Sequence, residues 1–142
     1  MNQLAKTTSI IELHVPDFNP VKKFYGDLGF TILWEYPAKG QEGYLTMKLE
    51  ENILAFFCGT EEVYNHDYFK KFSKETPRGY AVEVTLFVTS PIEDYYNNIK
   101  KNYSNSIVEK LVTRPWGIKD FRIVDPFGFY IRISEPTDMS KP

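Results

Sequence analysis

The 142-residue sequence predicts an α+β fold made of two βαβββ modules. Three observations lead to this prediction: strand-like alternation of apolar and polar residues, two helices that start at a proline, and the same order of elements in both halves. The helices start at Pro20 and Pro91, about half a chain length apart. Two such half-sheets are expected to curl around a common space, and at this length the chain is most simply one domain.

The first module is expected to span residues 9–58. Its first strand, residues 9–15, directs alternate side chains to opposite faces of a sheet. Ile11, Leu13 and Val15 share one face, and Ile10, Glu12 and His14 share the other.

A helix follows this strand. Asn19 is the expected N-cap and Pro20 suits the first helical position. The apolar residues at helical spacing are Val21, Phe24, Tyr25 and Leu28. Gly29 stands where the end of a helix favours a left-handed residue.

Three more strands and a polar segment complete the first half of the chain. The strands are expected over residues 30–36, 43–49 and 52–58, with turns at Gly40 and at Glu50–Glu51. Residues 59–79 have no sustained strand pattern and are interpreted as a linker, with a short helix around residues 66–72. A linker of this length allows the modules to pair within one chain or between two chains, and it is also suited to act as a lid.

The second module is expected over residues 80–134. Residues 81–88 alternate as a strand. In the helix that follows, Ser90 and Glu93 are expected to form a capping box, with Pro91 at the first helical position. The apolar stripe of this helix is Ile92, Tyr95, Tyr96, Ile99 and Tyr103.

A strand over residues 106–112 leads to a closing hairpin, RPWGIKDFRIVDPFGFYIRI, at residues 114–133. Asp125 and Gly128 suit its tight turn. The alternation directs Phe129, Ile131 and Ile133 inward and puts Tyr130 and Arg132 on the other face. Residues 135–142 form a C-terminal tail.

The composition limits the possible functions. Lys and Arg number 17 against 19 Asp and Glu, a net charge of −2, which argues against a nucleic-acid-binding face. Cys58 is the only cysteine, so no intramolecular disulfide forms, which fits a cytoplasmic protein. No apolar run is long enough to span a membrane, and MNQLAKTTS lacks the apolar region of a signal peptide. No nucleophile motif, phosphate loop or dinucleotide fingerprint is present.

Three stretches resemble the vicinal-oxygen-chelate superfamily, which includes glyoxalase I, extradiol dioxygenases, fosfomycin-resistance enzymes and bleomycin-resistance proteins. They are VPDFNPVKKFYGDLGF, FVTSPIEDYYNNIKK and RPWGIKDFRIVDPFGFYIRI. The third, with its PWG loop and DPxG turn, is similar to the bleomycin-resistance branch in particular. This resemblance implies curved mixed sheets around a cleft, and it implies a homodimer.

The resemblance also implies where a divalent metal would bind. Carried over by motif, the ligand positions fall on Ile10, Glu83 and Arg132, and the remaining position falls on Ala55 or Phe56. Only Glu83 is able to bind a metal, and Arg132 would place a fixed positive charge beside it. Because a catalytic divalent ion normally needs at least three protein ligands, we expect neither a metal nor a cofactor. Glu83 and Arg132 are expected to pair with each other, as a structural ion pair or as polar anchors for a ligand.

The residues expected to bind a ligand combine polar and aromatic side chains. They are Glu12, His14, Trp34, Glu83, Phe87, Trp116, Tyr130 and Arg132. Two acids against one fixed base make this cleft mildly acidic, which favours a cationic or neutral aromatic ligand. The expected function is metal-independent sequestration of a small molecule, with no nucleic-acid or membrane partner.

Two other classes of function stay open. A metal-dependent lyase or dioxygenase would use Glu12, His14 and Glu83 as unconventional ligands, although the second histidine, His66, falls in the linker. A protein-interaction module would present an exposed apolar patch instead of a small-molecule pocket. Stoichiometric metal in the purified protein would favour the enzyme.

Overall fold

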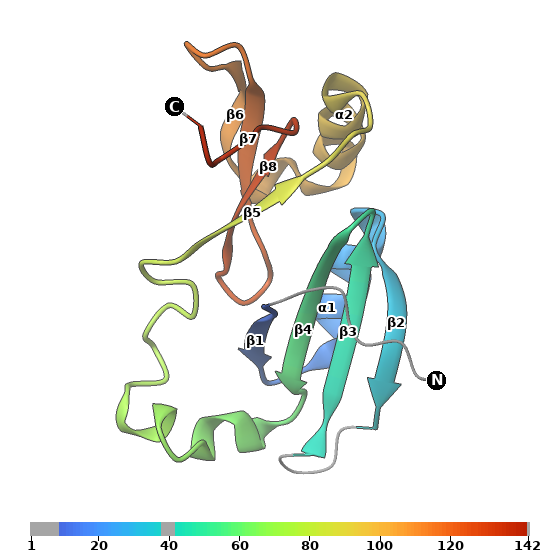
Figure 1. Cartoon of the computed structure of the whole chain (residues 1–142). Coiled ribbons are helices and arrows are strands. Elements are labelled where there is room, and N and C mark those ends of the chain that lie inside the picture. Colours follow the sequence, from blue (N-terminus) through green and yellow to red (C-terminus); the bar gives the residue numbers. More distant parts are fainter. Residues whose placement is uncertain (1–8, 38–41, 142) are drawn as a thin grey trace. The chain divides into compact units, whose positions relative to one another are not determined.

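The computed structural model describes residues 9–37 and 42–141 (Figure 1). These residues form two compact units, which meet in the sequence between Phe72 and Ser73; we call them the N-terminal and the C-terminal unit. Each has a four-stranded sheet and an α-helix in the order βαβββ. The predicted α+β class and the two βαβββ modules are therefore confirmed. The turn expected at Gly40 lies outside the described residues.

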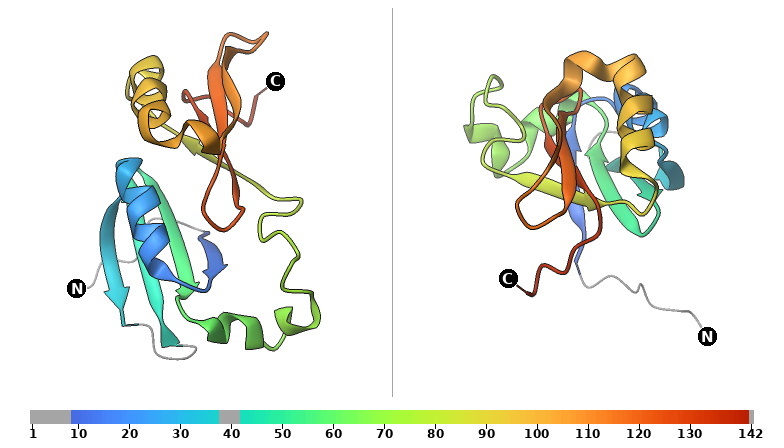
Figure 2. Two further views of the ribbon diagram at one scale, coloured as in Figure 1. Left: turned by 180° about the vertical axis from the view of Figure 1, so that it is seen from behind. Right: turned by 90° about the horizontal axis from the view of Figure 1, so that it is seen from above.

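The N-terminal unit carries a mixed sheet with the strand order β1-β4-β3-β2. Its elements are β1 (Ile11–Val15), α1 (Phe18–Asp27), β2 (Thr31–Tyr36), β3 (Tyr44–Leu49) and β4 (Asn52–Cys58). Strand β1 runs parallel to β4, and the other neighbouring strands are antiparallel. Figure 2 shows α1 lying across one face of this sheet.

Apolar side chains between α1 and the sheet form the core of this unit. The sheet contributes Leu13, Val15, Leu45, Met47, Leu54 and Phe56, and the helix contributes Phe18, Val21, Phe24 and Tyr25. The ring of Tyr25 lies 5.1 Å from that of Phe56, measured between centroids. The alternation of the strands therefore directs the other set of side chains away from α1, onto what we call the open face.

The start of α1 differs from the prediction. The helix begins at Phe18 and its N-cap is Asp17, whose carboxylate accepts a hydrogen bond from the backbone N–H of Asn19 at 2.9 Å. The carboxylate of Asp17 thus caps the helix two residues before Asn19 would, and Pro20 becomes the third helical residue. At the other end, Gly29 has a φ of +101°, as the sequence indicated.

The C-terminal unit has the corresponding strand order, β5-β8-β7-β6. Its elements are β5 (Glu83–Phe87), α2 (Ile92–Tyr103), β6 (Ile107–Thr113), β7 (Lys119–Val124) and β8 (Tyr130–Ser134). The core side chains include Val84, Leu86, Ile92, Ile99, Phe121, Ile123, Ile131 and Ile133. The inward direction predicted for Phe129, Ile131 and Ile133 is confirmed, because all three are buried.

The capping box predicted for α2 is absent. The helix begins at Ile92, and its N-cap, Pro91, makes no side-chain capping bond. Glu93, the expected partner of Ser90, forms an ion pair with Lys119 on β7. The carboxylate of Glu93 therefore binds Lys119, whereas in a capping box it would accept the backbone N–H of Ser90.

The segment that follows β4 and precedes β5 in the sequence contains two short 3₁₀ helices, η2 (Glu61–Asn65) and η3 (Phe69–Lys71). The helix expected around residues 66–72 is limited to η3, and η2 was not predicted. In residues 9–37 and 42–141, no helix is both long and apolar enough to cross a membrane.

Candidate functional site

A row of aromatic side chains crosses the open face of the N-terminal sheet. In the strand register, His14 on β1 is opposite Phe57 on β4, and Phe57 is opposite Tyr44 on β3. Tyr44 is in turn opposite Tyr36 on β2. The ring centroids of His14 and Phe57 are 5.1 Å apart, and those of Phe57 and Tyr44 are 6.5 Å apart. One aromatic side chain from each strand therefore lies in a row across this face, which we call the aromatic row.

Trp34 extends the aromatic row along β2. Its ring stacks on that of Tyr36 at 6.2 Å and lies 5.8 Å from that of Tyr44. A register shift between Ile32 and Trp34 puts Trp34 opposite Thr46, a residue of the open face. The side chain of Trp34 is 51% exposed, so its indole is accessible to a ligand.

Glu12 supplies the negative charge beside the aromatic row. Its Oε2 lies 3.0 Å from Nε2 of His14, which confirms that these two predicted residues share a face. Burial raises the pKa of Tyr44 to about 12, and a hydrogen bond to Glu12 and the charge of that carboxylate add to the effect. The phenol of Tyr44 therefore stays neutral at physiological pH and donates its O–H to Glu12.

His66 lies beside His14, which the sequence did not reveal. The ring centroids of the two histidines are 5.1 Å apart, and the ring of Phe69 lies 5.3 Å from that of His14. Nδ1 of His66 accepts the backbone N–H groups of Tyr68 and Phe69, at 3.1 and 3.2 Å, and so shapes the turn into η3. The only sequence signal was a histidine two residues before an aromatic pair, which is too weak to predict this contact.

Glu12, His14 and His66 are not arranged as a metal site. Nε2 of His14 faces Glu12, and Nδ1 of His66 accepts backbone hydrogen bonds. Within the described ranges, no group of three or more His, Cys, Asp or Glu side chains is placed to hold a metal ion. Of the positions that the resemblance assigned to metal ligands, Ile10 is exposed, whereas Ala55 and Phe56 are fully buried.

On the face of the C-terminal sheet opposite its buried core, which we likewise call the open face, Glu83 pairs with Arg122. Oε1 of Glu83 lies 2.6 Å from Nε of Arg122, so the predicted ion pair between Glu83 and Arg132 is wrong. Arg122 and Arg132 are directly opposite each other on β7 and β8. Both arginines therefore lie on the same face as Glu83. The carboxylate binds Arg122 on β7, although Arg132 is on β8, the strand next to β5.

Arg122 belongs to a wider ion-pair network. Its Nη1 lies 3.1 Å from Oε2 of Glu109, and Arg114 contacts both Glu109 and Asp120. The hydrogen bond from Arg114 holds the pKa of Glu109 below its ordinary value. The same carboxylates raise the pKa of Arg114, Asp120 first among them. Arg114 and Arg122 therefore engage the carboxylates of Glu83, Glu109 and Asp120.

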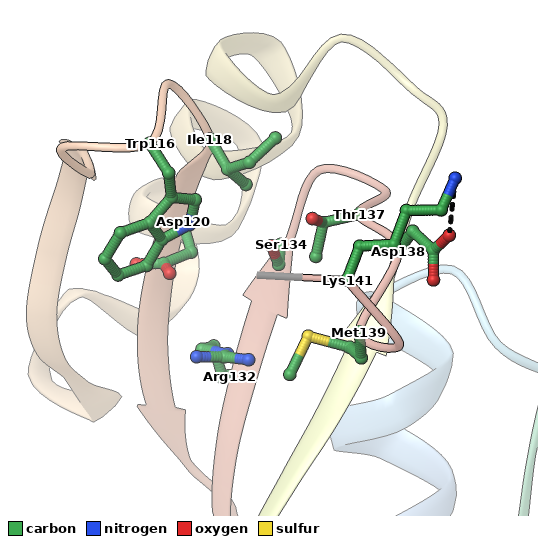
Figure 3. A pocket seen from close by; sticks show the side chains of 9 residues that line it. All are labelled: Trp116, Ile118, Asp120, Arg132, Ser134, Thr137, Asp138, Met139 and Lys141. Carbon is green, nitrogen blue, oxygen red and sulfur yellow. Dashed lines mark ion pairs between the residues drawn. The ribbon is translucent and has the colours of Figure 1, made fainter.

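A groove of about 330 Å³ lies in the C-terminal unit, between the sheet and the C-terminal tail (Figure 3). It is lined by Trp116, Ile118, Asp120, Arg132, Ser134, Thr137, Asp138, Met139 and Lys141. It combines two predicted residues, Trp116 and Arg132, with a tail whose contribution the sequence did not indicate. Trp116 is 66% exposed, so its indole is free to contact a ligand.

Arg132 carries an unused hydrogen-bond donor. Its Nε is buried and has no hydrogen-bond partner among the residues that the structure describes. Leaving such a donor unpaired costs about 1–3 kcal/mol. Its cross-strand neighbour Arg122, in contrast, is bound by Glu83 and Glu109.

The remaining predicted residues, Phe87 and Tyr130, also lie on the open face of the C-terminal sheet. Tyr130 is opposite Glu83, and Phe87 is opposite Ser134, which lines the groove. Both side chains are partly exposed. Neither of them lines the groove itself.

Comparisons with known proteins agree with the fold. The model of the Glyoxalase/Bleomycin resistance protein/Dioxygenase superfamily matches residues 7–133. A protein of unknown function from Agrobacterium tumefaciens has a similar structure, with a TM-score of 0.70 and 19% identity over 95% of this chain and 98% of that one. No curated protein sequence matches the chain.

Two further similar structures carry a function in their names. A bleomycin-binding protein complexed with bleomycin aligns with a TM-score of 0.63 and 18% identity, over 93% of this chain and all (100%) of that one. A bleomycin resistance determinant encoded on the transposon Tn5 aligns with a TM-score of 0.64 and 18% identity, over 94% and 100% of the two chains. At these identities the likeness supports the fold.

Proposed function

We propose that this chain, which belongs to the Glyoxalase/Bleomycin resistance protein/Dioxygenase superfamily, binds an aromatic small molecule and acts by sequestering it. The observation that carries the proposal is the aromatic row, with Trp34 beside it. Rings that cross a whole sheet offer stacking surface, and stacking is a main source of affinity for planar ligands. The bleomycin-binding relative supports the same class of function.

The ligand that meets the aromatic row is proposed to be neutral or cationic. Glu12 is the acid beside this row, and it already bonds His14. A carboxylate next to exposed rings favours a positively charged or uncharged aromatic group over an anion.

Binding is proposed to be independent of metal and cofactor. The support is chemical: of the four ligand positions carried over from the family, three hold Ile10, Arg132 and an apolar residue of β4. Elemental mass spectrometry of untagged protein, purified without chelator, tests this directly. About one divalent ion per chain would refute metal independence and favour an enzyme that uses Glu12 and His14.

The biological setting completes the proposal. We propose one domain that works as a homodimer in the cytoplasm, in line with the family resemblance and with Cys58 as a free, buried thiol. Sedimentation equilibrium of the purified protein tests the dimer, because a monomer at micromolar concentration would contradict it.

Stacking on the aromatic row is testable with bleomycin and with a naphthyl amine as probes. NMR signals of the indole N–H groups report on Trp34 in one unit and Trp116 in the other. We expect the Trp34 signal to shift. We also expect Tyr36→Ala to weaken binding about two- to tenfold, since an aromatic contact contributes roughly 0.5–1.5 kcal/mol. Tyr80→Ala is the matched control, because Tyr80 is 76% exposed and lies outside both sheets. Full affinity in Tyr36→Ala would refute stacking on this row.

A further inference from the structure

We infer that the groove of the C-terminal unit binds the anionic group of an aromatic ligand, a carboxylate or a phosphate, and that Arg132 recognises it. This inference rests on the proposed function, that the protein binds an aromatic small molecule. It concerns the groove of the C-terminal unit, whereas the neutral or cationic group was proposed for the ligand at the aromatic row.

The first step is the state of the arginines on the open face. Arg122 is bound by Glu83 at 2.6 Å and by Glu109 at 3.1 Å, and Arg114 is bound by Asp120 at 2.8 Å. Arg132 has no ion pair among the described residues, and its buried Nε has no acceptor. Of these three arginines, Arg132 is therefore the one whose charge no carboxylate of the described residues compensates.

The second step concerns the two acids that line the groove with Arg132. Asp120 is buried and accepts from Nε of Arg114 at 2.9 Å. Asp138 accepts from the backbone N–H of Ser140 at 2.9 Å and lies 3.7 Å from Nζ of Lys141. Because both carboxylates are engaged elsewhere, an anionic ligand group is the acceptor that would match the charge of Arg132.

The third step is the geometry of the groove. Figure 3 shows Arg132 at its floor, with Trp116 on one side and Met139 on the other. Both flanking side chains are more than half exposed. Indole and thioether groups pack well against aromatic rings. Its volume of about 330 Å³ falls at the lower end of the roughly 300–1,000 Å³ typical of small-molecule sites, so one or two fused rings fit.

The guanidinium group explains the choice of anion. Its planar set of N–H donors matches two oxygens of a carboxylate or phosphate, and charge-assisted bonds of this kind are among the strongest in proteins. In this groove, a cationic ligand group would instead meet the charge of Arg132. The preference for a cation expected from the sequence counted Glu12 and Glu83 as two acids against one base, Arg132. In the structure a second base, Arg122, binds Glu83.

The test uses four probes that share one ring system: naphthoate, naphthyl phosphate, neutral naphthamide and a cationic naphthyl amine. NMR follows the indole N–H of Trp116 and the Nε–H of Arg132, with the indole of Trp34 as a reporter for the other unit. We expect naphthoate or naphthyl phosphate to shift both groove signals and to bind about tenfold more tightly than naphthamide. The tighter of the two anions identifies the natural group as a carboxylate or a phosphate.

Variants assign the effect to one side chain. Arg132→Gln is expected to abolish the preference for the anion over naphthamide, and Arg132→Lys to retain part of it. Lys110→Gln is the matched control, because Lys110 is exposed on β6 and its loss changes the net charge equally. The comparison of the probes in the wild-type protein requires no variant, so it stands even if Arg132→Gln does not fold.

The outcomes separate this inference from the proposed function. Equal affinities for naphthoate and naphthamide at the Trp116 signal would overturn it, and so would an undiminished anion preference in Arg132→Gln. If Trp34 responds to the probes while Trp116 and Arg132 do not, small-molecule binding is supported and the anion site is refuted. A lack of response at both indoles would refute both.

Discussion

Arg122 and Arg132 offer a direct test of how charge is distributed on the C-terminal sheet. They are the same residue type, directly opposite each other on neighbouring strands, and only Arg122 has carboxylate partners in the described structure. We expect Arg122→Gln to lower the free energy of unfolding by about 2 kcal/mol, and Arg132→Gln to lower it by less than about 0.5 kcal/mol.

The magnitude follows from the geometry. Arg122 makes two charge-assisted hydrogen bonds, to Glu83 and to Glu109, and its own side chain is 14% exposed. Such a bond contributes roughly 1.5–3 kcal/mol when its partners are shielded from water. The side chains of Glu83 and Glu109 are 35% and 37% exposed, so solvent screening reduces each bond to about 1 kcal/mol. Arg132→Gln removes no ion pair and relieves repulsion from Arg122.

Urea denaturation at neutral pH, followed by far-UV circular dichroism, measures both values, provided that the slope with denaturant is the same in all variants. Glu83→Gln completes a double-mutant cycle: we expect a coupling energy of about 1 kcal/mol with Arg122→Gln and none with Arg132→Gln. The reasoning is refuted if Arg132→Gln costs as much as Arg122→Gln, or if Glu83 couples to Arg132.

Three further predictions concern single side chains. Asp125 accepts two backbone hydrogen bonds of the hairpin turn, at 2.8 and 3.0 Å, so Asp125→Ala should destabilise by about 2 kcal/mol and Asp125→Asn by less, as urea midpoints would reveal. The pKa of Tyr44 is raised from 10.0 to about 12. The neutral phenol therefore contributes to the stability of the fold below pH 10.0, and this contribution is lost as the pH rises through 12. Glu12→Gln should lower the pKa of Tyr44, as measured by a tyrosinate absorbance titration. The hydrogen bond from Arg114 holds the pKa of Glu109 below 4.5. The ionised Glu109 therefore stabilises the fold above pH 4.5, and this contribution is lost as the pH falls below that value. Glu109→Gln should make the free energy of unfolding less sensitive to acid, and an unchanged acid profile would contradict this.

Local patterns in the sequence were sufficient for the elements and for the faces of the strands. The strand predicted over residues 52–58 has the same bounds as β4, and Phe129, Ile131 and Ile133 are buried as predicted. These predictions succeeded because the burial of one face imposes a period of two on a strand, and that period is visible in the residues themselves. The capping residues were harder to predict. Several nearby side chains are able to accept the first N–H groups of a helix, and the local pattern does not show which of them does so.

The candidate site was only partly predictable. Glu12 and His14 do share a face, and Trp116 and Arg132 do line one groove. The partner of Glu83 was wrong, because the choice between Arg122 and Arg132 depends on strand order and on the reach of a long side chain. His66 was assigned to a linker, yet a turn shaped by its own Nδ1 brings it next to His14.

The sequence by itself determined the two βαβββ modules, the side chains that build their cores, and the aromatic and charged character of the open faces. Only the tertiary structure decided which charges neutralise each other, and it did so by pairing Glu83 with Arg122 and leaving Nε of Arg132 without an acceptor in the described residues. The physical reason is that burial of one face leaves a pattern along each strand, which the sequence shows. An ion pair depends instead on the distance between atoms of different strands. That distance is set by strand register and side-chain length, neither of which appears in a local pattern.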